Sequence, residues 1–265
     1  MSSLVRRMLT HARTAWLEGF VRRVGYLEVD SPVVSVAFDD VPRSAVENGL
    51  PILNEFGTEA TFYTSLGLGS NEEFLGIEDL QELHGQGHEI GCHTYSHYRL
   101  STGSCGDFLK DAERNRNAIT MALNGVSPVS FSFPFGDMNL RLKKRLQEHY
   151  TSLRSSRPGV NFGAVDLNCL RAISLRSDEF STERVSKLLE DAERSSGWLI
   201  FYTHGIRSDA GRFDLTADML GELLFTCRAH GALFRRVGEV VAGMRELGKR
   251  YSSDTTGHSI HSSHR

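Results

Sequence analysis

From Val33 onward, short apolar runs alternate with longer stretches in which apolar residues recur at helical spacing. The short runs predict strands over 33–38, 60–63, 88–91, 129–132, 150–153, 170–173 and 198–202. The longer stretches predict helices over 44–56, 77–86, 105–123, 139–148, 181–195 and 214–230. Regular alternation of this kind is typical of parallel strands joined by crossover helices. The pattern therefore predicts an α/β fold in which about seven strands form a barrel.

The two ends of the chain differ from this pattern. Over residues 4–24 apolar positions recur at helical spacing, and five arginines accompany a single acid, Glu18. We interpret residues 1–30 as an amphipathic helical segment that either packs on the domain as a lid or makes peripheral contact with a membrane surface. Residues 251–265 are polar and lack periodicity, which predicts a disordered tail. The barrel is then expected over residues 31–250.

Composition narrows the class of protein. The 265 residues are 40% hydrophobic and 24% charged, as in an ordinary globular protein, and the net charge of -3 argues against a nucleic-acid partner. No apolar run approaches the roughly 20 residues of a membrane span. The amino terminus lacks the apolar core of a secretory signal. We therefore expect no signal peptide and a cytoplasmic location, with membrane association through residues 4–24 as an open alternative. The oligomeric state is left open.

Two adjacent acids, Asp39 and Asp40, end the apolar run that begins at Val33. In parallel barrels, chemistry gathers at the carboxyl ends of the strands. Neighbouring carboxylates repel each other unless a cation neutralises them. Their side chains diverge, so one acid can bind a metal ion while the other faces a water molecule. The alternative is a turn or a helix N-cap, because Pro42 and Ser44 lead into a predicted helix.

A histidine pair, His93 and His97, follows the strand predicted over 88–91. On a helical turn, this spacing of four residues places both imidazoles on one face, where they can bind one metal ion. Two solvated loop histidines are the alternative. One carboxylate and two imidazoles form the ligand set of a catalytic divalent metal. The acids and histidines together therefore predict a metal-dependent hydrolase.

Two further motifs follow later strands. His204 lies just beyond the strand over 198–202, where it can act as a general acid or as a structural histidine. The segment Pro134-Phe135-Gly136 fixes a turn beyond another strand. Such a turn can direct a backbone N–H toward a developing oxyanion and offer an apolar wall to a sugar ring. Core packing explains its aromatic residues almost as well.

These motifs, in this order, resemble those of the NodB-homology polysaccharide deacetylases, carbohydrate esterase family four, over roughly residues 33–240. Phe38-Asp39-Asp40 resembles the first motif, whose first acid is the catalytic base and whose second binds the metal. His93-Thr94-Tyr95-Ser96-His97 resembles the metal-binding motif. Pro134-Phe135-Gly136 is similar to the end of the third motif, and Thr203-His204 to the last, whose histidine is the general acid. The resemblance implies a distorted (β/α)7 barrel.

The chain departs from the family pattern in two places. The third-motif arginine, which orients the base, is Ser132 here, and the fourth motif, Asp-x-x-Asp-Trp, is absent. Arg171 is our candidate for the missing arginine, with an ordinary ion-paired surface arginine as the alternative. Asp166 and Asp178 are candidate partners for His204. These departures indicate a divergent branch of the family.

The resemblance implies hydrolytic removal of acetyl groups from N-acetylated amino sugars of an oligo- or polysaccharide. It implies one divalent metal ion, expected to be zinc, held by Asp40, His93 and His97. Asp39 would be the base and His204 the general acid. The oxyanion would be bound by the backbone N–H of Phe135, next to Pro134 in the same turn.

The carbohydrate substrate is less well defined. A cytoplasmic enzyme cannot reach extracellular wall polymer, so an intracellular oligosaccharide or a lipid-linked glycan intermediate fits better. Three alternatives stay open: an O-acetyl esterase, a non-sugar amide hydrolase on the same barrel, and an inactive glycan-binding or assembly protein. The last is the least favoured, because the chain keeps Asp39, Asp40, His93, His97 and His204 together.

Overall fold

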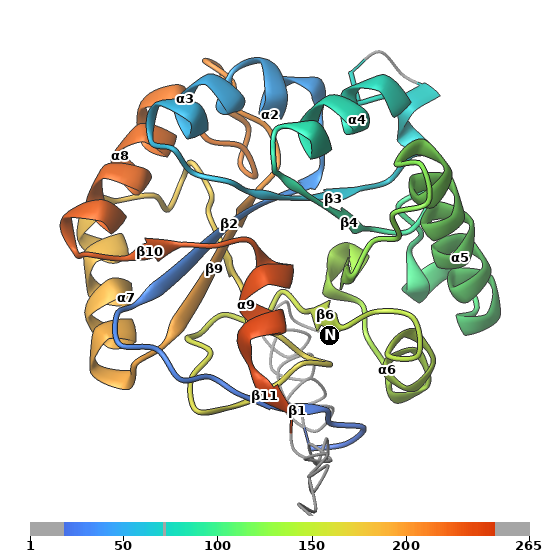
Figure 1. Cartoon of the computed structure of the whole chain (residues 1–265). Helices are drawn as coiled ribbons and strands as arrows, with labels where there is room; N and C mark the ends of the chain where they lie inside the picture. Colours follow the sequence, from blue (N-terminus) through green and yellow to red (C-terminus); the bar gives the residue numbers. More distant parts are fainter. Residues whose placement is uncertain (1–18, 71–72, 247–265) are drawn as a thin grey trace, which may run out of the picture.

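The computed structural model describes residues 19–70 and 73–246. Seven parallel strands form one curled sheet in the order β6-β5-β4-β3-β2-β9-β8, and a short strand, β10 (Leu233–Phe234), also pairs with β2 (Figure 1). The seven are β2 (Val33–Asp40), β3 (Thr61–Thr64), β4 (Glu89–Cys92), β5 (Ser130–Ser132), β6 (Ser152–Arg154), β8 (Ile173–Ser174) and β9 (Trp198–Thr203). Each overlaps a strand predicted from the apolar runs.

The two ends of this sheet meet. Arg154, at the end of β6, forms a parallel bridge to Leu170, which precedes β8. Ser155 N–H donates to the carbonyl of Leu170, and Leu170 N–H donates to the carbonyl of Leu153, each at 2.9 Å. These bonds close the sheet into a distorted seven-stranded barrel, so the predicted fold is confirmed.

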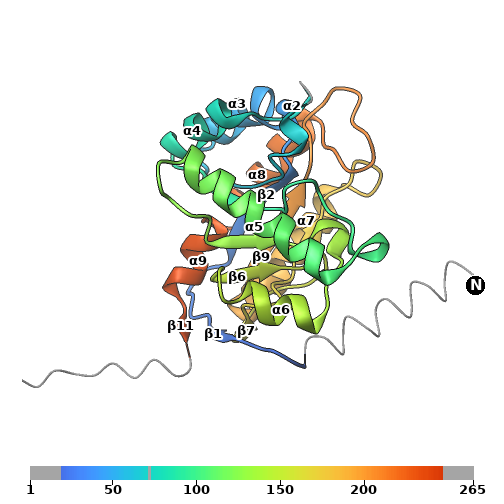
Figure 2. The ribbon, with the colours of Figure 1, turned by 90° about the vertical axis from the view of Figure 1, so that its right-hand side faces the viewer.

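Helices cover the outside of the barrel (Figures 1 and 2). They are α2 (Arg43–Glu47), α3 (Gly49–Glu55), α4 (Ile77–Gly85), α5 (Cys105–Ala122), α6 (Leu140–Leu146), α7 (Thr182–Ser195), α8 (Ala217–Ala229) and α9 (Val237–Gly243). The single helix expected over 44–56 is two helices. Pro51 lies in the first turn of α3 and has no N–H to donate to the carbonyl of Glu47, so one continuous helix is disfavoured there.

A small antiparallel sheet in the order β11-β1-β7 lies apart from the barrel sheet. It consists of β1 (Val24–Tyr26), β7 (Ala164–Asp166) and β11 (Arg245–Glu246). Residues 24–26, within the segment 1–30 that was expected to be helical, are therefore extended. Residues 1–18 of that segment and the expected tail over 251–265 lie outside the described residues. No helix in the described part has both the length and the apolar character needed to cross a membrane.

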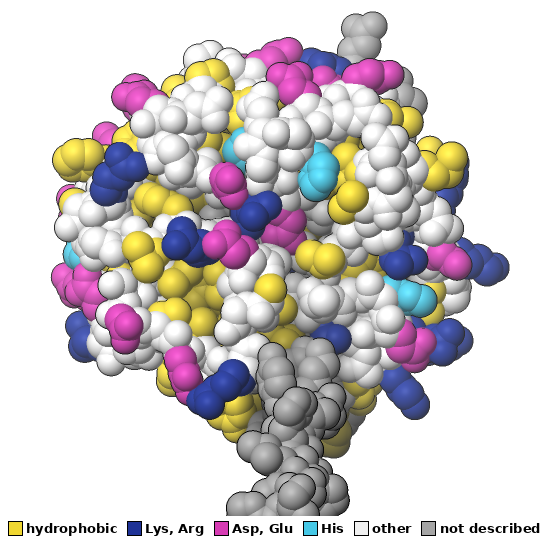
Figure 3. Space-filling model, in the orientation of Figure 1, with side chains coloured by type: hydrophobic (Ala, Val, Ile, Leu, Met, Phe, Trp, Pro, Cys, Tyr) yellow, Lys and Arg dark blue, Asp and Glu magenta, His cyan; other side chains and the backbone are white. Residues whose placement is uncertain are grey.

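Strand β2 runs through the centre of the sheet, between β3 and β9, and its side chains are buried from Val33 to Asp39. The ring of Phe38 stacks on that of Phe62, with 5.0 Å between the ring centroids. On the outer surface, basic and acidic side chains are interspersed over the face seen in Figure 3. The central position of β2 places Asp39 and Asp40 at the middle of the carboxyl-terminal edge of the barrel.

Candidate active site

Asp39 and Asp40 take up different positions at the end of β2. Asp39 is 4% exposed inside the barrel, whereas Asp40 is only partly buried. The backbone of Asp40 is left-handed, with φ of 60°, and that of Val41 follows with φ of 52°. This turn ends the strand, so the two carboxylates diverge.

His93 and His97 lie on a tight loop after β4, and not on the helical turn that their spacing suggested. Thr94 and His97 both have a left-handed backbone, with φ of 62° and 51°. Asp111, on α5, accepts hydrogen bonds from the N–H groups of Tyr95 and Ser96, each at 2.9 Å. The loop is therefore held from outside the barrel, and it turns both imidazoles toward Asp40.

The ligand atoms of Asp40, His93 and His97 lie within 4.8 Å of one another. Asp40 Oδ1 is 3.3 Å from His97 Nε2 and 3.6 Å from His93 Nε2. Ligands around a tetrahedral zinc ion, at about 2.1 Å from it, are about 3.4 Å apart. Sequence reasoning named these three residues from separate motifs, and the fold brings them together.

The protonation of the histidines agrees with a metal site. His93 Nδ1 lies 2.8 Å from the carbonyl oxygen of Ser132, so Nδ1 carries the proton and Nε2 directs a lone pair at Asp40. Burial lowers the pKa of both His93 and His97 to about 4, so both imidazoles are neutral at pH 7. Asp40 Oδ1 is buried without a hydrogen-bond partner. Lone pairs facing one another at these distances fit a divalent cation between them.

His204 lies across this group, beyond β9. Its Nε2 is 3.9 Å from Asp40 Oδ2, and its Nδ1 is 3.3 Å from the carbonyl oxygen of Phe213. The candidate partners Asp166 and Asp178 make their ion pairs elsewhere, with Lys143 and Arg212. A backbone carbonyl thus orients His204, where an acid had been considered.

The turn at Pro134–Gly136 stands on the other side. Phe135 has φ of 58°, and its ring packs on His97 with 4.3 Å between the ring centroids. Pro134 is buried, whereas Phe135 is 47% exposed. These side chains border a cavity of about 460 Å³, within the usual range for a small-molecule site. It is lined by Asp39, Asp40, His93, His97, Phe133, Phe135, Gly136, Arg154, Ser156, Tyr202, His204 and Phe213.

A sequence model of the family described as polysaccharide deacetylase matches residues 27–152. That span contains both acids, both metal-site histidines and the turn at Phe135. The chain is therefore similar to the polysaccharide deacetylase family over just under half of its length. The matched span ends before Arg154 and His204. Arg154 is identified from the fold, and His204 from the last sequence motif.

Individual relatives of the family match parts of the chain. The peptidoglycan-N-acetylmuramic acid deacetylase PdaC of Bacillus subtilis is 28% identical over 122 residues. This match spans 46% of this chain and 25% of that protein, so the chain covers about a quarter of its relative's length.

Solved structures of deacetylases and esterases share the barrel. A family 4 acetyl xylan esterase from Clostridium thermocellum, solved with a cobalt ion, superposes with a TM-score of 0.58 at 18% identity, over 79% of this chain and 90% of that one. A peptidoglycan N-acetylglucosamine deacetylase superposes with a TM-score of 0.59 at 16% identity, over 86% and 96% of the two chains. At this identity, the likeness shows the fold alone.

Arg154, at the end of β6, lies against Asp39 inside the barrel. Its guanidinium is 2% exposed, donates hydrogen bonds to Asp39 Oδ2 and Ser132 Oγ, and lies over the ring of Tyr202 at 4.3 Å. Ser132 and Arg154 are register partners on the parallel strands β5 and β6. Register partners on parallel strands face the same side of a sheet, so an arginine from either position can reach the barrel interior.

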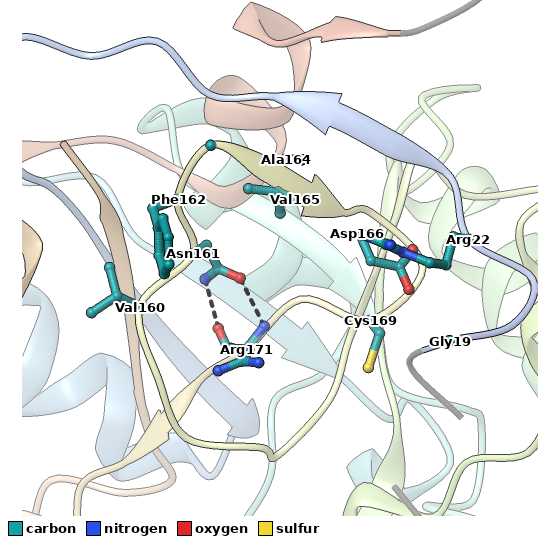
Figure 4. A pocket seen from close by; sticks show the side chains of 11 residues that line it. Gly19, Arg22, Val160, Asn161, Phe162, Ala164, Val165, Asp166, Cys169 and Arg171 are labelled. Atoms are coloured by element: carbon teal, nitrogen blue, oxygen red, sulfur yellow. Dashed lines mark hydrogen bonds between the residues drawn. The ribbon is translucent and has the colours of Figure 1, made fainter. Parts of the chain in front are cut away.

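Arg171 was expected beside Asp39, and the structure places it elsewhere. Its backbone forms two hydrogen bonds with the side chain of Asn161, at 2.9 and 3.0 Å (Figure 4). It lines a separate pocket together with Phe162 and Arg22. Among the described residues, the guanidinium bound to Asp39 is that of Arg154, which sequence reasoning missed because the predicted strand stopped at residue 153.

The charge on Asp39 follows from this contact. Burial alone would raise the pKa of Asp39, but Arg154, with smaller contributions from His93 and His204, holds the pKa below its ordinary value. Burial raises the pKa of Asp40, and the nearby His97 and His204 oppose that effect. Asp39 is therefore an ionised carboxylate at neutral pH, as a proton acceptor must be.

Proposed function

We propose that this chain is a metal-dependent hydrolase that removes acetyl groups from N-acetylated amino sugars in an oligo- or polysaccharide. The observation that carries the proposal is the arrangement around Asp40. Two neutral imidazoles converge on its carboxylate, with the ionised base candidate Asp39 beside it and His204 across it. The match of residues 27–152 to the polysaccharide deacetylase family supports the acetylated sugar as the substrate class.

Asp40, His93 and His97 would hold the divalent ion, and the donor set suits zinc. When bound, such an ion polarises an acetamide carbonyl and makes a nearby water molecule more acidic. Buried imidazoles with depressed pKa values bind the ion without first losing a proton.

The remaining steps use groups of the chain itself. Asp39 accepts a proton from water as the water oxygen adds to the acetamide carbon. Negative charge develops on the carbonyl oxygen, for which the backbone N–H of Phe135 is the proposed donor. The carbon–nitrogen bond then breaks, and its electron pair passes to nitrogen. His204 supplies the proton for that nitrogen, so the products are acetate and a free amino sugar.

Arg154 acts on the base without touching the substrate in this scheme. It fixes one oxygen of Asp39, Oδ2, while the other, Oδ1, is buried without a hydrogen-bond partner in the described structure. A carboxylate held by one oxygen keeps its second oxygen available for a proton. We therefore propose Arg154, in place of Arg171, as the residue that orients the base.

The test is acetate release by the purified full chain from matched N-acetylated and O-acetylated oligosaccharides, combined with analysis of bound metal. The proposal expects about one divalent ion per chain and faster release from the N-acetyl substrates. Faster release from O-acetyl substrates would favour the esterase alternative. A metal-loaded, folded protein that releases acetate from neither substrate would overturn the proposal. A lipid-linked glycan intermediate should be included among the substrates tested, because contact of residues 4–24 with a membrane is still a prediction.

A further inference from the structure

Two half-exposed phenylalanines flank the proposed centre. Phe135 packs on His97 at 4.3 Å, and Phe213 packs on His204 at 5.6 Å between ring centroids. They are 47% and 52% exposed, and both line the cavity. A saccharide that occupies the cavity would therefore have an aromatic ring on each side.

The guanidinium of an arginine lies over each of these two rings. The guanidinium carbon of Arg99 lies 3.4 Å from the ring centre of Phe135, and that of Arg212 lies 5.9 Å from the ring centre of Phe213. A guanidinium over an aromatic ring gains cation–π attraction and keeps N–H donors for other partners. A cation thus lies against each of the two aromatic rings that line the cavity.

The two arginines differ in their charge partners. Arg212 pairs with Asp178 at 3.2 Å, so its charge is largely compensated. Within residues 19–70 and 73–246, Arg99 makes no ion pair. The acid Asp137, two residues beyond Phe135, instead accepts the N–H of Ser101 at 3.3 Å. In the described part of the chain, Arg99 therefore has no carboxylate in direct contact with its guanidinium, whereas Arg212 has one.

The backbone around Arg99 is firmly held. Tyr98 N–H donates to Thr94 Oγ1 at 2.9 Å, and Tyr98 Oη accepts the N–H of Ser104 at 3.2 Å. The Tyr98 ring packs edge-on against Phe108 in the core. A cation on a fixed backbone binds an anion at a smaller cost in conformational entropy than one on a flexible loop.

We infer that Arg99 binds an anionic substituent, a carboxylate or a phosphate, carried by the glycan on the Phe135 side of the sugar that is deacetylated. This inference rests on the proposed function and narrows its substrate class to acidic saccharides. Arginine matches the planar, bidentate geometry of both anions. The acids at the bottom of the cavity do not oppose it strongly, since Arg154 compensates Asp39 and the proposed metal ion would compensate Asp40.

The test compares Arg99→Gln with the matched control Arg212→Gln on three substrates. These are a neutral N-acetylglucosamine oligomer, an oligomer whose neighbouring sugar carries a carboxylate, and one that carries a phosphate. In Arg99→Gln, the ratio of kcat/KM on an anionic substrate to that on the neutral one should fall about tenfold or more, mainly through KM. In Arg212→Gln the same ratio should stay as in the natural protein. Arg99→Lys, which keeps the charge and loses the fork, should fall in between.

The possible outcomes distinguish a failure of anion binding by Arg99 from a failure of the proposed deacetylase function. Whichever anionic substrate shows the larger loss identifies the group as carboxylate or phosphate. Equal ratios in the natural protein, Arg99→Gln and Arg212→Gln would overturn the inference and leave the deacetylase proposal standing. Absence of acetate from all three substrates would overturn the proposed function, and the inference with it. Thermal unfolding of each variant shows that it is folded before its kinetics are compared.

Discussion

Arg154 reaches across the inside of the barrel to Asp39, a residue 115 positions earlier in the chain, and binds its carboxylate. The same guanidinium donates to Ser132, its register partner on the adjacent strand. The small side chain of Ser132 leaves room for the arginine of the next strand. We propose that Arg154 takes the role that the family motif assigns to an arginine at position 132.

Replacing Arg154 by Met should lower kcat by about 100-fold or more, because Asp39 loses both its orientation and the charge that keeps it ionised. The pH–rate profile should also shift, with its acidic limb moving to higher pH as the pKa of Asp39 rises. Arg171→Met, at the position favoured by sequence alone, should change kcat by only a few-fold. Equal effects of the two substitutions would contradict the assignment.

The exchange variant Ser132→Arg/Arg154→Ser tests the register argument directly. It returns the arginine to the strand expected from the family motif. We expect kcat to recover at least tenfold relative to Arg154→Ser alone, since each position faces the barrel interior. A double variant no faster than the single one, though folded, would show that the two positions are not equivalent.

Asp39→Asn should abolish turnover while the protein keeps its metal ion. The amide cannot accept the proton of the attacking water, and a loss of about 10²–10⁴-fold in kcat is typical of a removed general base. Asp39 is not among the three grouped ligands, so metal content should be unchanged. Loss of metal in this variant would instead make Asp39 a ligand, and normal activity would exclude it as the base.

His97→Ala should remove the metal site without unfolding the barrel. His97 belongs to a loop, and its ring contributes one of the three converging ligand atoms. We expect the stoichiometric zinc of the natural protein to be lost, and the rise in Tm on adding zinc to disappear with it. His84→Ala, on α4, serves as the control. A zinc-dependent Tm that persists in His97→Ala would argue against these ligands.

His88 provides a pH-dependent contribution to stability away from the site. It is 2% exposed, its Nδ1 accepts the N–H of Ala60, and burial, with Arg236 nearby, lowers its pKa from 6.5 to about 4. The unfolded chain binds the proton first, so stability is lost as pH falls from 6.5 to 4, by up to about 3 kcal/mol.

His88→Asn keeps an acceptor for Ala60 and removes this titration. Chemical unfolding of both proteins between pH 7 and pH 4 should show their difference in free energy of unfolding shrinking as pH falls. Parallel curves of unfolding free energy against pH over that range would rule out His88 as the source of the pH dependence. Carboxylates that titrate in the same pH range affect both proteins equally, so their contributions cancel in the difference.

The sequence predicted the barrel because its strands are largely apolar runs, such as 33–38 and 198–202, that are buried on both faces. The short strands β1, β7, β10 and β11 and the helix α9 were missed because they lie outside the runs from which strands and helices were predicted. Local pattern thus gave the barrel and its helices but not the small second sheet.

The same difference between local and long-range signals applies to the residues of the candidate site. Asp39, Asp40, His93, His97 and His204 belong to short motifs, each readable where it stands. Arg154 has no such motif, because its role comes from pairing between β5 and β6 and from closure of the barrel at Leu170. One signal was present: Ser152 and Arg154 alternate with the apolar Leu153, which places an arginine on an inward-facing position of a strand.

Several residues of the site have a backbone that side chains disfavour. Asp40, Thr94, His97 and Phe135 have φ between 51° and 62°. For a residue with a Cβ, this conformation costs about 1–2 kcal/mol. These residues of the candidate site therefore lower the stability of the fold through their backbone conformation. Packing in the rest of the barrel must offset that cost. The variant His97→Gly should accordingly have a larger free energy of unfolding than His97→Ala. Selection for stability alone would therefore tend to replace these residues.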